Sequence, residues 1–149
     1  MIRVATGQDL AAVLALYHEL RPQDPLLTES QAEQTWQQMC ADPHCHVVVA
    51  EVEGQLAASC ALTLNIGLTN GARPFGMIEH VITASAFRRR GLSQQVLGFA
   101  IEFAWQLNCY KVMLLSGEQL HGAHRLYESV GMQSGIERGF VIKPPLSQT

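Results

Sequence analysis

Apolar and polar positions follow two periods along the chain, one typical of strands and one typical of helices. Residues 46–52 and 55–64 are rich in apolar and β-branched residues, and Glu53 and Gly54 between them favour a tight turn. These two segments therefore predict a β-hairpin. Further short apolar runs predict four more strands, at residues 2–4, 75–83, 111–115 and 136–142.

Four segments place apolar residues at helical spacing. Thr6 and Asp9 form a capping-box pattern ahead of the first, which begins at Leu10. The others are residues 28–39, a long helix that follows residues 88–93 and ends near Asn108, and residues 121–130, closed by Gly131. The predicted order is strand, two helices, three strands, helix, strand, helix and a last strand. This is a mixed α/β (α+β) pattern.

Composition restricts the class of protein. The chain has 149 residues, 48% of them hydrophobic, which suits a single domain over residues 1–149. A formal charge of −3 gives no global attraction to nucleic acid, and the apolar runs are shorter than the roughly 20 residues of a membrane span. We expect neither nucleic acid nor a membrane as a partner.

The four cysteines, Cys40, Cys45, Cys60 and Cys109, are too few for the disulfide framework of a small secreted scaffold. We expect reduced thiols in the cytoplasm. Cys40, Cys45 and His46 offer soft ligands close together, but no second pair completes a four-coordinate zinc site. A loop ahead of a strand explains the same residues, and no metal is predicted.

A basic turn is the clearest candidate site. Arg88, Arg89 and Arg90 form the longest run of like charges, and Gly91 follows them where a helix is expected to begin. Glycine lets the backbone approach a ligand, and a helix N-terminus favours negative charge. Three arginines oppose the helix dipole unless an anion offsets them. The turn therefore indicates an anion site, with a solvated helix start as the alternative.

Four segments between residues 75 and 132 give the turn a context. Residues 78–83, 87–93, 109–115 and 123–132 resemble, in order, the consecutive motifs of the GCN5-related N-acetyltransferases (GNAT family). The resemblance implies a central twisted mixed sheet with a splay between the fourth and fifth strands, flanked by about four helices. It also implies acetyl-CoA as cosubstrate without a metal. Family members are often dimers, so a homodimer is one expectation.

The resemblance assigns the coenzyme site to two neighbouring segments. Main-chain groups of Val81, Ile82 and Thr83 would bind the pantetheine arm, and the turn would hold the pyrophosphate. The residues of that turn are Arg88, Arg89, Arg90, Gly91, Leu92 and Ser93. Ser93 stands where the family has glycine or alanine. Its hydroxyl is able to donate to a phosphate oxygen.

Glu79 is the candidate base. An amine with a pKa of ~10.4 is protonated at neutral pH, so its proton must be removed before attack. Glu79 interrupts an apolar strand, where a carboxylate is costly without a partner or a role, and the family often has a glutamate there. The alternative is that Glu79 only orients a substrate amine or caps a neighbouring group. Strand alternation places His80 on the opposite face.

Tyr127 is the candidate acid, because the resemblance places it facing the coenzyme sulfur. A phenol with a pKa of ~10 can protonate a thiolate whose conjugate acid has a pKa of ~8.5. Packing of the ring in the core is the alternative, and His124 one turn earlier is a surface histidine or a neighbour on the same face. Cys60 and Cys109 lack a paired histidine. The predicted mechanism is therefore direct attack in a ternary complex.

The identity of the acceptor amine is the part of the predicted function that the sequence constrains least. The resemblance is to the family's small-molecule enzymes, such as glucosamine-phosphate acetyltransferases, which tend to have an acidic residue where this chain has His80. We expect a small-molecule amine substrate. Alternatives are a protein lysine or N-terminal acetyltransferase, a coenzyme A binding module that has no activity, and an interaction domain.

Overall fold

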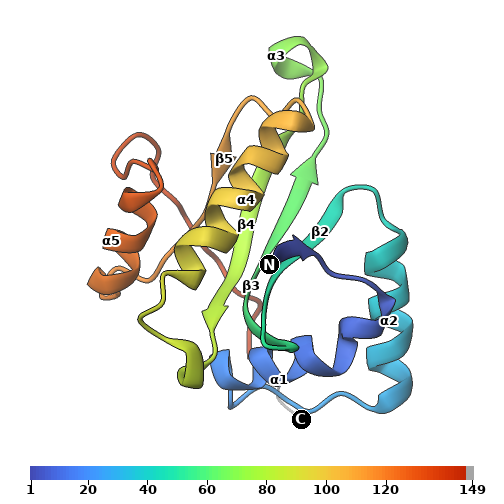
Figure 1. Ribbon diagram of the computed structural model, residues 1–149. Helices are drawn as coiled ribbons and strands as arrows, with labels where there is room; N and C mark the ends of the chain where they lie inside the picture. Colours follow the sequence, from blue (N-terminus) through green and yellow to red (C-terminus); the bar gives the residue numbers. More distant parts are fainter. Residues whose placement is uncertain (147–149) are drawn as a thin grey trace.

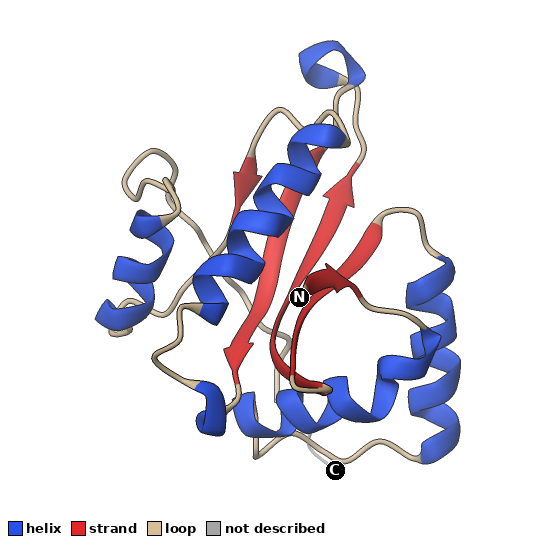
Figure 2. Cartoon of the chain, viewed as in Figure 1, coloured by secondary structure: helices blue, strands red, loops and turns tan. Residues whose placement is uncertain are grey.

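Five strands form one sheet whose order follows the sequence. The computed structural model describes residues 1–146. The strands are β1 (Ile2–Val4), β2 (Cys45–Val52), β3 (Gln55–Asn65), β4 (Phe75–Thr83) and β5 (Val112–Met113). Neighbours from β1 to β4 pair antiparallel, and β4 pairs parallel with β5 (Figure 2). The predicted hairpin and the mixed sheet are confirmed.

The two faces of the sheet are covered by different helices (Figure 1). The helices are α1 (Leu10–Leu20), α2 (Glu29–Ala41), the single turn α3 (Thr69–Ala72), α4 (Leu92–Gln106) and α5 (His121–Ser129). One core lies between α4 and the sheet, and a second lies beneath α1 and α2. Alternation along β2 divides its valines between them, because Val48 faces α4 whereas Val47 and Val49 contact the second core.

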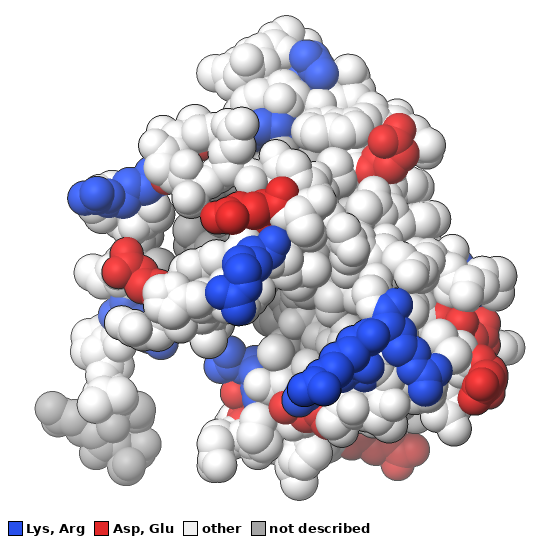
Figure 3. Space-filling view, turned by 60° about the vertical axis from the view of Figure 1, so that its left-hand side comes forward, with Lys and Arg blue, Asp and Glu red and all other residues white. Residues whose placement is uncertain are grey.

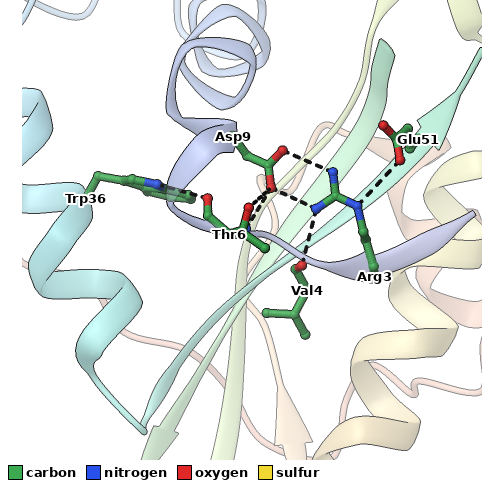
Figure 4. A network of polar contacts seen from close by, with 6 residues as sticks. All are labelled: Arg3, Val4, Thr6, Asp9, Trp36 and Glu51. Carbon is green, nitrogen blue, oxygen red and sulfur yellow. Dashed lines mark hydrogen bonds and ion pairs between the residues drawn. The ribbon is translucent and has the colours of Figure 1, made fainter. Parts of the chain in front are cut away.

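The start of α1 is held by a polar network (Figure 4). Both terminal guanidinium nitrogens of Arg3 donate to the Asp9 carboxylate, at 2.8 and 3.0 Å, and Asp9 also accepts from the Thr6 N–H at 2.7 Å. Trp36 of α2 donates its indole N–H to the Thr6 carbonyl at 3.2 Å. The network joins β1, α1 and α2. The predicted helix start is confirmed, although its first turn, Gly7–Asp9, is a 3-10 turn.

The predicted last strand, residues 136–142, is wrong. This segment has no regular structure, and Phe140 and Ile142 are 87% and 97% exposed. An ion pair of Glu137 with Lys111, at 3.0 Å, links it to the residue before β5. A strand needs a neighbour that shares its hydrogen bonds, and β5 is only two residues long instead of the five expected. None of the helices in residues 1–146 has the length and apolar character needed to cross a bilayer.

Candidate active site

β4 and β5 separate soon after they meet. Their paired residues are Gly76 with Val112 and Met77 with Met113. From Ile78 to Thr83, the edge of β4 that faces β5 pairs with no other strand in the described chain. This is the predicted splay, and it leaves main-chain groups of β4 open where Val81, Ile82 and Thr83 lie.

A bulge interrupts β4 beside the splay. Glu79 pairs with Ala61 and Ile82 pairs with Ser59, so His80 and Val81 together oppose Cys60 alone. His80 has a φ of 55°, a left-handed backbone conformation that residues other than glycine adopt infrequently. The bulge breaks the alternation of side chains along the strand.

The bulge brings His80 to Glu79. Nε2 of His80 lies 3.6 Å from Oε2 of Glu79, and the imidazole packs against the ring of Tyr17 on α1, with 5.4 Å between ring centroids. The prediction that His80 occupies the face opposite Glu79 is therefore wrong. Glu79 is 64% exposed, so the argument that burial makes its carboxylate costly does not apply either. The exposed carboxylate is open to substrate and water instead.

The basic turn of residues 88–93, called the arginine turn from here on, follows shortly after β4. A short 3-10 turn, Ser85–Phe87, leads into Arg88, Arg89 and Arg90, and all three are exposed. Basic side chains gather in the lower half of Figure 3, the half in which Figure 1 places the end of β4 and the start of α4. Glu19 of α1 accepts a hydrogen bond from the Ser85 N–H at 3.1 Å, and its pKa is lowered by that bond and by nearby Arg88.

Gly91 is the residue that starts α4. Its φ of 72° is left-handed, and no side chain caps the helix there. A Cβ built on Gly91 would meet no atom within 4 Å, so the space in front of this backbone is open. Leu92 is buried and holds the first turn against the core. Open backbone, an uncapped helix start and three exposed guanidinium groups fit a diphosphate.

Ser93 contacts the strand before the turn. Its hydroxyl forms a hydrogen bond with the hydroxyl of Thr83, the last residue of β4. The two segments assigned to the coenzyme are thus joined by side chains. The donation by Ser93 to a phosphate oxygen stays a prediction.

Tyr127 lies on α5 and is half-buried against the core beneath α4. Burial raises its pKa, and Cys60, which lies opposite the bulge, adds to the rise. The nearby Ser116 hydroxyl opposes it, although Ser116 Oγ is buried without a formed hydrogen bond. The phenol therefore stays protonated at neutral pH, as an acid must. His124 contacts the loop before α5, where its Nε2 lies 2.9 Å from the Gly117 carbonyl.

Two residues near the site were missed from the sequence. In the sequence, Tyr17 is simply one of the apolar positions of the helix that begins at Leu10, yet its buried hydroxyl has no partner and burial raises its pKa to about 12. Ser116 stands in the loop after β5 without a motif of its own. Both residues are recognised by a contact between separate helices, strands or loops, and the spacing of residues in the sequence does not reveal such contacts.

The cysteines do not suit a covalent route. All four are free thiols. Burial raises the pKa of Cys60 to about 12 and also raises that of Cys109. A thiol that resists ionisation is a poor nucleophile. Within residues 1–146, no three His, Cys, Asp or Glu side chains are grouped so that they could hold a metal ion.

The family follows from comparison with known proteins. The model of the acetyltransferase (GNAT) family matches residues 13–132. The chain therefore belongs to this family. It is 32% identical over 112 residues to glucosamine 6-phosphate N-acetyltransferase 1 of Oryza sativa subsp. japonica, covering 73% of this chain and 67% of the relative.

Two further comparisons extend over most of the chain. Glucosamine 6-phosphate N-acetyltransferase of Trypanosoma brucei brucei is 27% identical over 133 residues, which cover 89% of this chain and 88% of the relative. A solved structure from Agrobacterium tumefaciens str. C58, which carries an acetyltransferase assignment, has a TM-score of 0.91 at 40% identity. It covers 97% of this chain and 99% of its own.

Proposed function

We propose that the protein transfers the acetyl group of acetyl-CoA to a primary amine of a small molecule, by direct attack in a ternary complex. The observation that carries this proposal is the course of β4. The strand leaves its neighbour at the splay, presents Glu79 there, and leads through a short 3-10 turn into the arginine turn. The proposed base and the proposed diphosphate site thus follow each other along one stretch of chain.

The coenzyme would be held by main chain at both ends of this segment. The open edge of β4 at Val81, Ile82 and Thr83 would bind the pantetheine arm. The turn from Arg88 to Ser93 would bind the diphosphate, with Arg88, Arg89 and Arg90 supplying charge. When bound, acetyl-CoA supplies an activated thioester.

Glu79 would remove the proton from the substrate ammonium. Its carboxylate is exposed at the splay, so a small polar amine reaches it directly or through one water. Tyr127 would return a proton to the leaving sulfur. The raised pKa of Tyr127 keeps its hydroxyl protonated. Cys60, which contributes to that rise, lies opposite the bulge in β4.

Both sequence relatives described above are named for glucosamine 6-phosphate, which supports an amino sugar as the first acceptor to test. His80 replaces the acidic residue expected of such enzymes, so the acceptor class is proposed more broadly as a small primary amine.

The four free thiols support a role in a reducing compartment such as the cytoplasm. Exposed apolar residues at positions 136–142 support a homodimer.

Thiol release from acetyl-CoA tests the proposal. The wild-type protein is assayed with glucosamine 6-phosphate, free amino sugars, an aminoglycoside and a lysine peptide. We expect release with at least one small amine and a loss of about 10²-fold or more in Glu79→Gln. Release with the peptide alone would favour a protein acetyltransferase. Coenzyme binding without release in any mixture would favour a binding module.

A further inference from the structure

We infer that His80 receives, from Glu79, the proton removed from the substrate ammonium and passes it to water. The inference rests on the proposed function, because it needs Glu79 to act as the base. It adds a second residue to the proton path. The Glu79–His80 contact and the bulge that creates it carry the argument.

The contact exists because β4 is irregular at this point. In a regular strand, adjacent side chains point to opposite faces and cannot meet. With His80 and Val81 both opposite Cys60, and His80 at a φ of 55°, Nε2 of His80 lies 3.6 Å from Oε2 of Glu79. A small rotation of either side chain brings these atoms to hydrogen-bond distance.

The imidazole also packs against α1. Its ring lies against that of Tyr17 at an interplanar angle of 50°. The Tyr17 hydroxyl is buried and without a partner, and its pKa of about 12 keeps it protonated. Tyr17 therefore supplies a packing surface and does not compete for the proton. The imidazole thus contacts both the Glu79 carboxylate and the Tyr17 ring.

The proton path balances without any further reactant. An N–H bond of the substrate ammonium breaks and its proton binds a carboxylate oxygen of Glu79. The proton then moves to Nε2 of His80, which restores the carboxylate and forms an imidazolium. His80 is 43% exposed, so water can take the proton and leave the neutral imidazole. A substrate seated on Glu79 would shield that carboxylate from water, and His80 offers a route around it.

A substitution at His80 that tests the inference must tolerate the φ of 55° at this position. Asparagine tolerates the left-handed conformation and cannot carry the proton, so His80→Asn keeps the bulge and removes the relay. We expect kcat for thiol release to fall roughly tenfold, less than the loss of 10²–10⁴ usual for removing a general base. The KM for the amine and the calorimetric Kd for acetyl-CoA should change less than twofold. His18→Asn, an exposed histidine of α1, is the matched control and should keep the wild-type kcat.

Rescue by a free base separates a proton role from a structural one. His80→Gly also permits the left-handed backbone and leaves space beside Glu79. Added imidazole should restore at least half of its lost kcat, and the same imidazole should not change the wild-type rate. In the Glu79→Gln background, His80→Asn should cause no further loss, because the two groups act in series.

The outcomes separate the inference from the proposed function. If the wild-type protein releases no thiol with any amine, or if Glu79→Gln keeps full activity, the proposed base fails and the inference falls with it. If Glu79→Gln is impaired but His80→Asn keeps the wild-type kcat, the inference alone is overturned. It is also overturned if imidazole gives no rescue, or if the two substitutions lower kcat independently.

Discussion

The hydroxyls of Thr83 and Ser93 are hydrogen-bonded to each other across the arginine turn. Thr83 ends β4 and Ser93 lies in the first turn of α4. The bond therefore closes a loop whose middle contains the exposed arginines and Gly91. It gives Ser93, the one departure from the family pattern in this turn, a structural role within the protein.

Ser93→Ala tests that role. Losing the hydroxyl pair should lower the free energy of unfolding by about 1 kcal/mol, as for a typical hydrogen bond. The Kd for acetyl-CoA should rise less than threefold, because the backbone of the turn is retained. Chemical denaturation and calorimetry measure the two quantities. A Kd raised tenfold or more at unchanged stability would instead assign the hydroxyl to a phosphate.

Gly91→Val tests the turn itself. No atom lies within 4 Å of a Cβ at Gly91, so the free protein bears only the cost of a left-handed valine, about 1–2 kcal/mol. A bound diphosphate would meet the side chain, so the Kd for acetyl-CoA should rise at least tenfold.

Gly91→Asn is the matched control for strain. Asparagine accepts the φ of 72° and still adds a Cβ. Its stability should remain close to that of the wild-type protein while its affinity for acetyl-CoA falls. Wild-type affinity in both variants would remove the turn from the coenzyme site.

Tyr127→Phe tests the proposed acid. The phenyl ring keeps its packing against the core, so the Kd for acetyl-CoA should stay within twofold. Loss of the proton donor should lower kcat by about 10²-fold or more. Steady-state kinetics and calorimetry decide between the roles. Weaker coenzyme binding with an unchanged kcat would assign Tyr127 to packing.

Asp9→Asn tests the network at the start of α1. Arg3 holds the pKa of Asp9 below its ordinary value of ~3.9, so the native state favours the carboxylate. The stabilisation is present above about pH 4 and is lost as the pH falls through the lower native pKa. At pH 7 the variant should be less stable by about 1–2 kcal/mol, and the difference should shrink at pH 3.

An exposed ion pair provides the control for that measurement. Asp24 contacts Arg21 at 2.8 Å, but its side chain is 53% exposed, against 12% for Asp9. Asp24→Asn should change the free energy of unfolding by less than about 0.5 kcal/mol. Equal losses from both substitutions would contradict a stabilising role for the partly buried polar network around Asp9.

Local patterns predicted most of the fold. The hairpin of β2 and β3 followed from β-branched residues around Glu53 and Gly54, and the helix expected at residues 28–39 is Glu29–Ala41. The turn at Gly91 was readable because a glycine beside three arginines satisfies a local backbone requirement. These features depend on neighbours in sequence.

The predictions that were wrong concern features that depend on contacts between residues far apart in the sequence. Residues 136–142 have the composition of a strand, but β5 is too short to share hydrogen bonds with them. The bulge at His80 depends on how β4 registers with β3, which the apolar pattern of residues 75–83 does not encode. Because of that bulge, alternation gave the wrong side for His80.

Initial rates over a grid of acetyl-CoA and amine concentrations test the central claim most directly. Direct attack in a ternary complex predicts double-reciprocal lines that intersect, together with one equivalent of N-acetylated amine for each thiol released. Parallel lines would indicate an acyl-enzyme and contradict the account, as would thiol release without an acetylated amine.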